Sequence, residues 1–304
     1  MKDAGRVWKM RREKTFPLII LAGLVVFYII PSAMTVGPRT NKLSIHIYYN
    51  PDVENQDLDL GILDINDWPL SSDWITKWST KPDTITMRSY VANDTFEFDL
   101  NNQMWPTGWL GYNNLTGDPH FNASWHFRKA LAHLTNKTWI VNDLLKGYGY
   151  KIETPIPPSM QEYQWPELVP YNYSRVDASA ELAEGGFYRE GGLWKWNGEA
   201  LPKLKIYLEL DDPYRRTACE YLVTELRAID FTDAQLDVKI IEQRIIGPYD
   251  PVMTLYDYHI NTGHHAFSPT PEHIYDLYHS TFYFGWGAPS VGWAPNYVGF
   301  CNRD

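Results

Sequence analysis

Cysteine is scarce in this sequence, and so are clustered basic residues. Two cysteines among 304 residues are too few for a disulfide-stapled scaffold, and they form no CxxC pair of the kind that binds zinc. The 27 Lys and Arg are outnumbered by 37 Asp and Glu, with no basic stripe, which argues against nucleic-acid binding because phosphate contacts need clustered cations. Motifs of the GxSxG, P-loop and HExxH kinds are also missing, so the sequence predicts neither an enzyme nor a cofactor.

Aromatic residues are abundant by contrast. The chain has 13 Trp, 21 Tyr and 12 Phe, and 44% of its residues are hydrophobic. That share is enough for a sizeable core, and the length allows one large domain or two lobes. Rings in this number suit a packed interior as well as surfaces that stack on a ligand.

The N-terminus is basic first and then apolar. Residues 1–14 contain six Lys and Arg against Asp3 and Glu13, and residues 15–38 carry no charge. The basic flank predicts the cytoplasmic side, so the rest of the chain is expected outside, membrane-anchored or secreted. Two interpretations of residues 1–39 stay open, namely a transmembrane anchor over 15–38 or a signal peptide cleaved near Ser32-Ala33.

Five glycosylation sequons and the two cysteines fit an extracytoplasmic location. The candidate acceptors for N-glycosylation are Asn93, Asn114, Asn122, Asn136 and Asn172. In an oxidising compartment Cys219 and Cys301 can form a disulfide, and two buried free thiols are an equally good interpretation.

Strand and helix patterns alternate along the chain. Alternating apolar residues predict strands over 43–49, 84–90, 95–100, 204–210, 236–241 and 252–260. Helical spacing predicts two helices within 124–147 and others over 174–183 and 272–279. A further helix opens at Asp212-Pro213, with an acidic cap and proline at its first position. This alternation indicates an α/β architecture.

Six short motifs follow one another within residues 43–300. They are His126-Phe-Arg-Lys-Ala-Leu-Ala-His133, Lys146-Gly-Tyr-Gly149, Thr154-Pro-Ile-Pro-Pro158, Tyr171-Asn-Tyr-Ser174 leading to Ala183-Glu-Gly-Gly186, Asp212-Pro-Tyr-Arg-Arg216, and the segment 258–280. In this order they resemble the extracytoplasmic solute-binding proteins of ABC importers, in the oligopeptide- and dipeptide-binding family (family 5).

The resemblance implies a fold and partners. The fold is a two-lobed α/β structure of the periplasmic-binding-protein type II, with mixed sheets and helices, here preceded by the transmembrane segment. Residues 40–120 would form a partial first lobe with the segment that returns to the cleft. Residues 121–304 would form a large solute-binding lobe that is incomplete at its C-terminus. The implied partners are a peptide or other small solute and the permease and ATPase subunits of the importer.

The resemblance also places a ligand site. Peptide binders of this family hold the ligand's α-ammonium with an aspartate in a segment that corresponds to residues 263–272. Here His264 replaces a tryptophan and Thr270 falls near the acidic position, which leaves Glu272 as the nearest carboxylate. The predicted ligand-binding residues are Tyr258, His264, His265, Phe267, Glu272 and Trp105.

Two alternatives compete with this interpretation. The histidines near residue 264 could bind a metal, but neighbouring side chains on a strand point apart, so no metal ligand is predicted. The whole chain could instead be a cell-surface structural or glycan-binding module that keeps the fold without transport.

Overall fold

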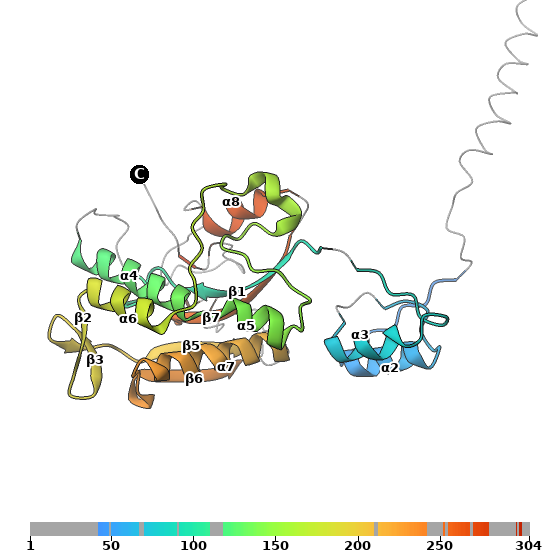
Figure 1. Ribbon diagram of the computed structural model, residues 1–304, viewed down its shortest axis with the longest axis horizontal. Coiled ribbons are helices and arrows are strands. Elements are labelled where there is room, and N and C mark those ends of the chain that lie inside the picture. The colour runs from blue at the N-terminus through green and yellow to red at the C-terminus, as the bar shows by residue number, and fades with distance from the viewer. Residues whose placement is uncertain are drawn as a thin grey trace, which may run out of the picture. The chain divides into compact units, whose positions relative to one another are not determined.

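A computed structural model (Figure 1) describes residues 42–48, 50–66, 70–89, 91–109, 118–209, 212–241, 252, 255–267, 270–279, 296 and 298–299. The chain divides into two compact units, Met1–Pro69 and Leu70–Asp304. Within the described ranges, no helix has both the length and the apolar character that a membrane span requires. The predicted span over residues 15–38 lies outside these ranges.

The described part of the first unit contains one helix, α2 (Pro51–Asp59). Its N-terminus is set by Asn50, whose side chain accepts a hydrogen bond from the Asp52 amide. The strand predicted over 43–49 was wrong, because residues 42–48 have no regular secondary structure. Alternating apolar residues make a strand only where a neighbouring strand pairs with them, and no described strand pairs with this segment.

The second unit is built on a four-stranded mixed sheet in the order β1-β7-β5-β6 (Figure 1). The strands are β1 (Asp94–Leu100), β7 (Ile260–Ala266), β5 (Leu204–Glu209) and β6 (Leu236–Ile241). β7 runs antiparallel to β1 and parallel to β5, and β5 is parallel to β6. Helix α7 (Pro213–Ala228) makes the crossover from β5 to β6 that parallel strands need. The predicted α/β architecture is therefore confirmed.

The other described elements of the second unit are helices, short helical turns and a small second sheet. The helices are α3 (Ser72–Ser79), α4 (Pro119–Leu134), α5 (Lys137–Trp139), α6 (Arg175–Glu184) and α8 (Glu272–Tyr278), with a π-helical turn (Ile140–Leu144) and 3-10 turns (Pro158–Tyr163, Asp233–Gln235). A small antiparallel sheet contains β2 (Phe187–Glu190), β3 (Leu193–Trp196) and β4 (Glu199–Ala200).

Two further predicted strands, both in the second unit, differ from the structure. Residues 84–89 are irregular, and the strand predicted over 252–260 begins only at Ile260. The second error has a clear cause, because β7 reads Ile-Asn-Thr-Gly-His-His-Ala and lacks the apolar alternation by which strands are recognised. Its polar residues belong to the candidate site.

Helix α7 begins as its sequence predicts. The Asp212 carboxylate accepts hydrogen bonds from the amides of Tyr214 and Arg215, and Pro213 holds the first position. Cys219, in the middle of α7, is a fully buried free thiol, and burial raises its pKa to about 12. Cys301, its candidate disulfide partner, lies outside the described residues.

The two faces of the sheet differ in chemistry. Ile206, Leu208 and Ile260 point into the main hydrophobic core, which they share with α4, α6 and α7. Phe98 and Leu100 of β1 pack against the same core. Because side chains alternate along a strand, residues 97 and 99 of β1 and 261, 263 and 265 of β7 lie on the opposite face. This second face is the polar one.

Candidate functional site

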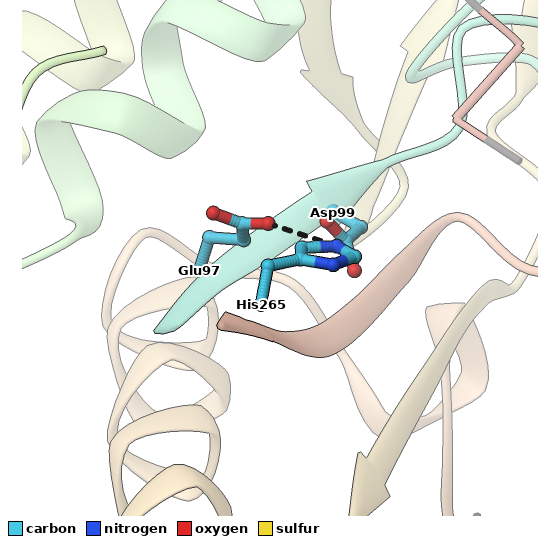
Figure 2. A group of neighbouring side chains, drawn as sticks. All are labelled: Glu97, Asp99 and His265. Atoms are coloured by element: carbon cyan, nitrogen blue, oxygen red, sulfur yellow. Dashed lines mark ion pairs between the residues drawn. The ribbon is translucent and has the colours of Figure 1, made fainter. Parts of the chain in front are cut away.

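Three titratable side chains converge on the polar face of the sheet. Glu97 and Asp99 come from β1 and His265 comes from β7 (Figure 2). The Glu97 Oε1 atom lies 3.3 Å from His265 Nε2, and one ligand-type atom from each residue falls within 4.8 Å of the others. We call these three residues the β1–β7 cluster.

Neutral neighbours hold the two carboxyl groups in place. The Thr95 hydroxyl donates to Glu97 Oε2 at 3.0 Å, and the Asn261 side-chain amide donates to Asp99 Oδ2 at 3.1 Å. Gly263, directly opposite Glu97, leaves room for Asp99, because a β-carbon at Gly263 would lie 2.2 Å from Asp99 Oδ2. The glycine is therefore part of the site's shape.

Burial sets the protonation of the cluster. Desolvation is the main cause that raises the pKa of Glu97 to about 8, and the nearby Asp99 carboxylate adds to it. The hydrogen bond from Thr95 acts in the opposite direction and lowers this pKa. Desolvation, helped by His264, His273 and Arg215, lowers the pKa of His265 to about 4. At neutral pH the imidazole is therefore uncharged and Glu97 is mostly protonated, so their contact is not an ion pair. A cationic ligand would favour the charged form of the carboxyls.

Helix α8 covers part of this region. Tyr278 packs with the buried Tyr207 and Tyr258, and burial, then Glu97 and Asp99, raises its pKa. His273 of α8 stacks on Phe267 with ring centroids 3.6 Å apart, and Phe267 stacks on His265 at 5.7 Å. A ladder of three rings thus joins the end of β7 to α8.

The predicted ligand residues at the end of β7 differ in exposure. His264 is exposed, with its Nε2 4.0 Å from an Asp94 carboxylate oxygen, whereas the His265 side chain is only 17% accessible. Phe267 is half-buried in the ring ladder. Glu272 is exposed at the first position of α8. The structure brings these four residues to one end of β7.

Tyr258 and Trp105 lie elsewhere. Tyr258 is completely buried in a second apolar cluster, where its carbonyl accepts a hydrogen bond from Asn101. Trp105 packs against the main core and contacts Trp109 and Trp196. Both residues therefore have structural packing partners, and Tyr258 precedes the start of β7.

The candidate glycosylation sites also differ in their surroundings. Asn122 and Asn172 are exposed, and Asn93 is half-buried just before β1. The Asn136 side chain caps α5 by accepting from the Trp139 amide at 3.0 Å and donates to the Tyr221 hydroxyl. Asn114 lies outside the described residues.

His259, just before β7, is buried. Its Nδ1 accepts a hydrogen bond from the Lys205 amide at 2.9 Å, so its Nε2 carries the proton that is donated to the Trp105 carbonyl at 2.8 Å. This neutral imidazole ties β5 and the segment before β7 to the Trp105 loop. Burial lowers its pKa to about 4.

Acid is expected to destabilise the fold through His259. Its pKa is about 4 when folded and 6.5 in the reference state, so the unfolded chain binds more protons between these values. The contribution of the neutral His259 imidazole to the free energy of unfolding is complete above pH 6.5. It is lost as the pH falls toward 4, which lowers the free energy of unfolding by up to about 3 kcal/mol. Urea unfolding at several pH values measures the slope of the unfolding free energy against pH. A His259→Gln variant with the same slope as the wild type would show that His259 does not carry it.

Comparison with known families decides the chain's identity. Residues 36–282 match the family model described as bacterial extracellular solute-binding proteins, family 5 middle. The chain belongs to this family. The match spans the candidate site and all strands of the main sheet, and confirms the resemblance seen in the short motifs.

Solved structures share the fold of this family 5 member. The oligopeptide-binding protein AppA from Bacillus subtilis, in complex with a nonapeptide, is 19% identical with a TM-score of 0.60. NikZ from Campylobacter jejuni, in complex with Ni(L-His), is 16% identical with a TM-score of 0.59. Each match covers 84% of this chain and 45% of the other, so the chain spans less than half the length of these proteins. No curated protein sequence matches.

Glu97 and Asp99 were missed at the sequence level, although a signal was present. The strand reads Asp-Thr-Phe-Glu-Phe-Asp-Leu, which alternates two acids with two phenylalanines. Acids two residues apart on a strand share a face, so this spacing places Glu97 and Asp99 on one side of β1. Their burial depends on the pairing with β7, which is 160 residues away along the chain and could not be read from the local pattern.

Proposed function

We propose that this chain captures peptides or similar small solutes outside the cytoplasm and presents them to the permease and ATPase of an ABC importer. The family match over residues 36–282 carries the proposal. The fold it shares with AppA, which holds a nonapeptide, supports it. In this proposal residues 15–38 keep the protein at the membrane or are cleaved on export. A second lobe closes over the solute, as expected for the type II binding-protein architecture.

The end of β7 is the proposed ligand surface. His264 and Glu272 are exposed there, and Phe267 offers an aromatic edge beside them. Glu272 would pair with the ligand's ammonium group, while His264 and Phe267 would contact the peptide backbone and side chains. An extended peptide can also bond to strand edges, which gives broad specificity because backbone groups are common to all peptides.

Calorimetry with defined peptides tests this surface. The full chain is expected to bind short peptides that have a free N-terminus. Glu272→Gln is expected to weaken that binding up to about fivefold, the effect of an exposed ion pair of up to about 1 kcal/mol. The same peptides with an acetylated N-terminus have no ammonium group, so they should bind the variant and the wild type with equal affinity.

Glu184→Gln is the matched control, because Glu184 is an exposed glutamate in α6. If Glu272→Gln weakened the binding of free and acetylated peptides equally, or if the control variant lost as much affinity, Glu272 would not pair with the ligand's ammonium group. Absence of binding by any peptide would contradict peptide capture itself.

Saccharides are the second candidate class. A structure of an oligopeptide ABC transporter binding protein from Thermotoga maritima with bound mannohexaose shares the fold, at 16% identity and a TM-score of 0.55, over 84% of this chain and 46% of that one. The abundant aromatic residues would suit sugar rings, which stack on aromatic faces. Binding of manno-oligosaccharides without binding of peptides would favour this candidate.

A further inference from the structure

The β1–β7 cluster has the composition and spacing of a metal site. It offers two carboxylates and one imidazole, the ligands that borderline-soft divalent ions bind. Its Glu97 Oε1 and His265 Nε2 atoms are 3.3 Å apart. Metal–ligand bonds of about 2.1 Å in tetrahedral geometry place neighbouring ligand atoms roughly 3.4 Å apart.

One oxygen of the cluster, Glu97 Oε1, is buried and has no hydrogen bond among the described residues. Its other oxygen is held by Thr95, so Oε1 stays directed toward His265. Two carboxyl groups this close and this buried repel each other when ionised, and a bound cation would offset that cost.

A second cluster in the described part of the chain provides a contrast. His126, Glu181 and Glu184 also approach within ligand distance. However, Glu181 is already paired with Lys129 at 2.8 Å and with His126 at 2.6 Å, and Glu184 is mostly exposed. That cluster has its own cation, whereas the side chain that orients Glu97 is the neutral Thr95 hydroxyl.

We infer that Glu97, Asp99 and His265 bind a divalent transition-metal ion such as Zn²⁺. Thr95 and Asn261 act as the outer shell, since each fixes one carboxyl group by a hydrogen bond. The ion would link β1 to β7 and leave a coordination position for water or a ligand. This assignment differs from the sequence-based expectation of no metal ligand, and it does not depend on solute transport.

Titration of the chelator-treated full chain with Zn²⁺ alone tests the inference. Calorimetry and elemental analysis after gel filtration are expected to give one ion per chain, and Zn²⁺ should raise the melting temperature. Asp99→Asn and His265→Gln are each expected to weaken binding by more than the roughly 10- to 100-fold that outer-shell changes cause.

Two further variants separate metal loss from misfolding. Glu97→Gln replaces the carboxyl group by a neutral group of the same shape, so without metal it should melt no lower than the wild type, yet it should bind Zn²⁺ weakly. His264→Gln alters the neighbouring exposed histidine, which points to the other face, and should bind normally. No stoichiometric zinc in the wild type, or equal binding by all four variants, would overturn the assignment. A loss of zinc that follows Glu184→Gln would overturn it as well.

Discussion

An Asn101→Asp variant is expected to lose most of its native stability. Asn101 is completely buried just after β1, and its side-chain amide donates to the carbonyls of Tyr256 and Tyr258 at 2.8 and 2.9 Å. Aspartate has the same shape but no donor, so its oxygen would face two carbonyl oxygens. Two unpaired buried acceptors and a buried charge should cost at least about 4 kcal/mol. The free energy of unfolding of a natural domain is only about 5–15 kcal/mol in total.

Chemical denaturation of the variant and the wild type measures this loss. The difference between them should narrow as the pH falls, because burial raises the pKa of the introduced carboxyl and its protonated form regains one donor. Asn197→Asp, in an exposed turn at a positive φ of 49°, should change stability by less than about 0.5 kcal/mol. An Asn101→Asp protein as stable as this control would show that the Asn101 bridge does not hold the fold.

A Gly263→Ala variant is expected to be destabilised by about 2–4 kcal/mol, since overpacking a buried site forces its neighbours to move. Its β-carbon would lie 2.2 Å from Asp99 Oδ2, and Asp99 is buried between the strands with little room to retreat. Thermal and urea unfolding measure the change. The variant should also lose the proposed zinc binding, because Asp99 would be displaced.

A double-mutant cycle identifies the cause. Adding Asp99→Ala to Gly263→Ala removes the atoms that collide, so the double variant should be more stable than the sum of the single effects predicts. Gly149→Ala is the control, because its β-carbon would meet the flexible end of Leu145 at 2.9 Å and Val141 Cγ2 at an ordinary contact distance of 3.9 Å. Strictly additive effects at Gly263 and Asp99 would contradict the proposed packing.

The elements with local signals could be predicted from the sequence. Asp212 and Pro213 start α7 where an acidic cap and a proline at the first position predict a helix. Ser174 likewise caps α6 by accepting from the Asp177 amide. The alternating Leu204–Glu209 forms β5 as predicted, because it is central in the sheet and its apolar side chains enter the core.

The elements with non-local causes could not be predicted. β7 is polar because its outer face lines the cluster with Glu97 and Asp99, and that pairing joins residues far apart in sequence. Leu43, Ile45 and Ile47 alternate as a strand would, yet each is about four-fifths exposed at 79%, 79% and 82%. Alternation of apolar residues therefore indicates only a tendency to form a strand. Whether a strand forms depends on pairing with a neighbouring strand.

The same limit applies to the site. His264, His265, Phe267 and Glu272 were placed by their resemblance to a family segment, and the structure puts them in β7, just after it and at the start of α8. Tyr258 was placed by the same reasoning but is part of the core, because its position before β7 turns it into the second apolar cluster. Motifs thus located the segment, while burial of individual side chains followed from tertiary packing.

Solute capture, the central claim, is tested most directly by native mass spectrometry of the full chain, purified gently in detergent without refolding. The chain should carry a heterogeneous series of small adducts that fragment as peptides. Unliganded chain should acquire the same adducts when a mixture of short peptides is added. A bare protein mass that stays bare after peptides are added would contradict the proposal that this family 5 member captures peptides.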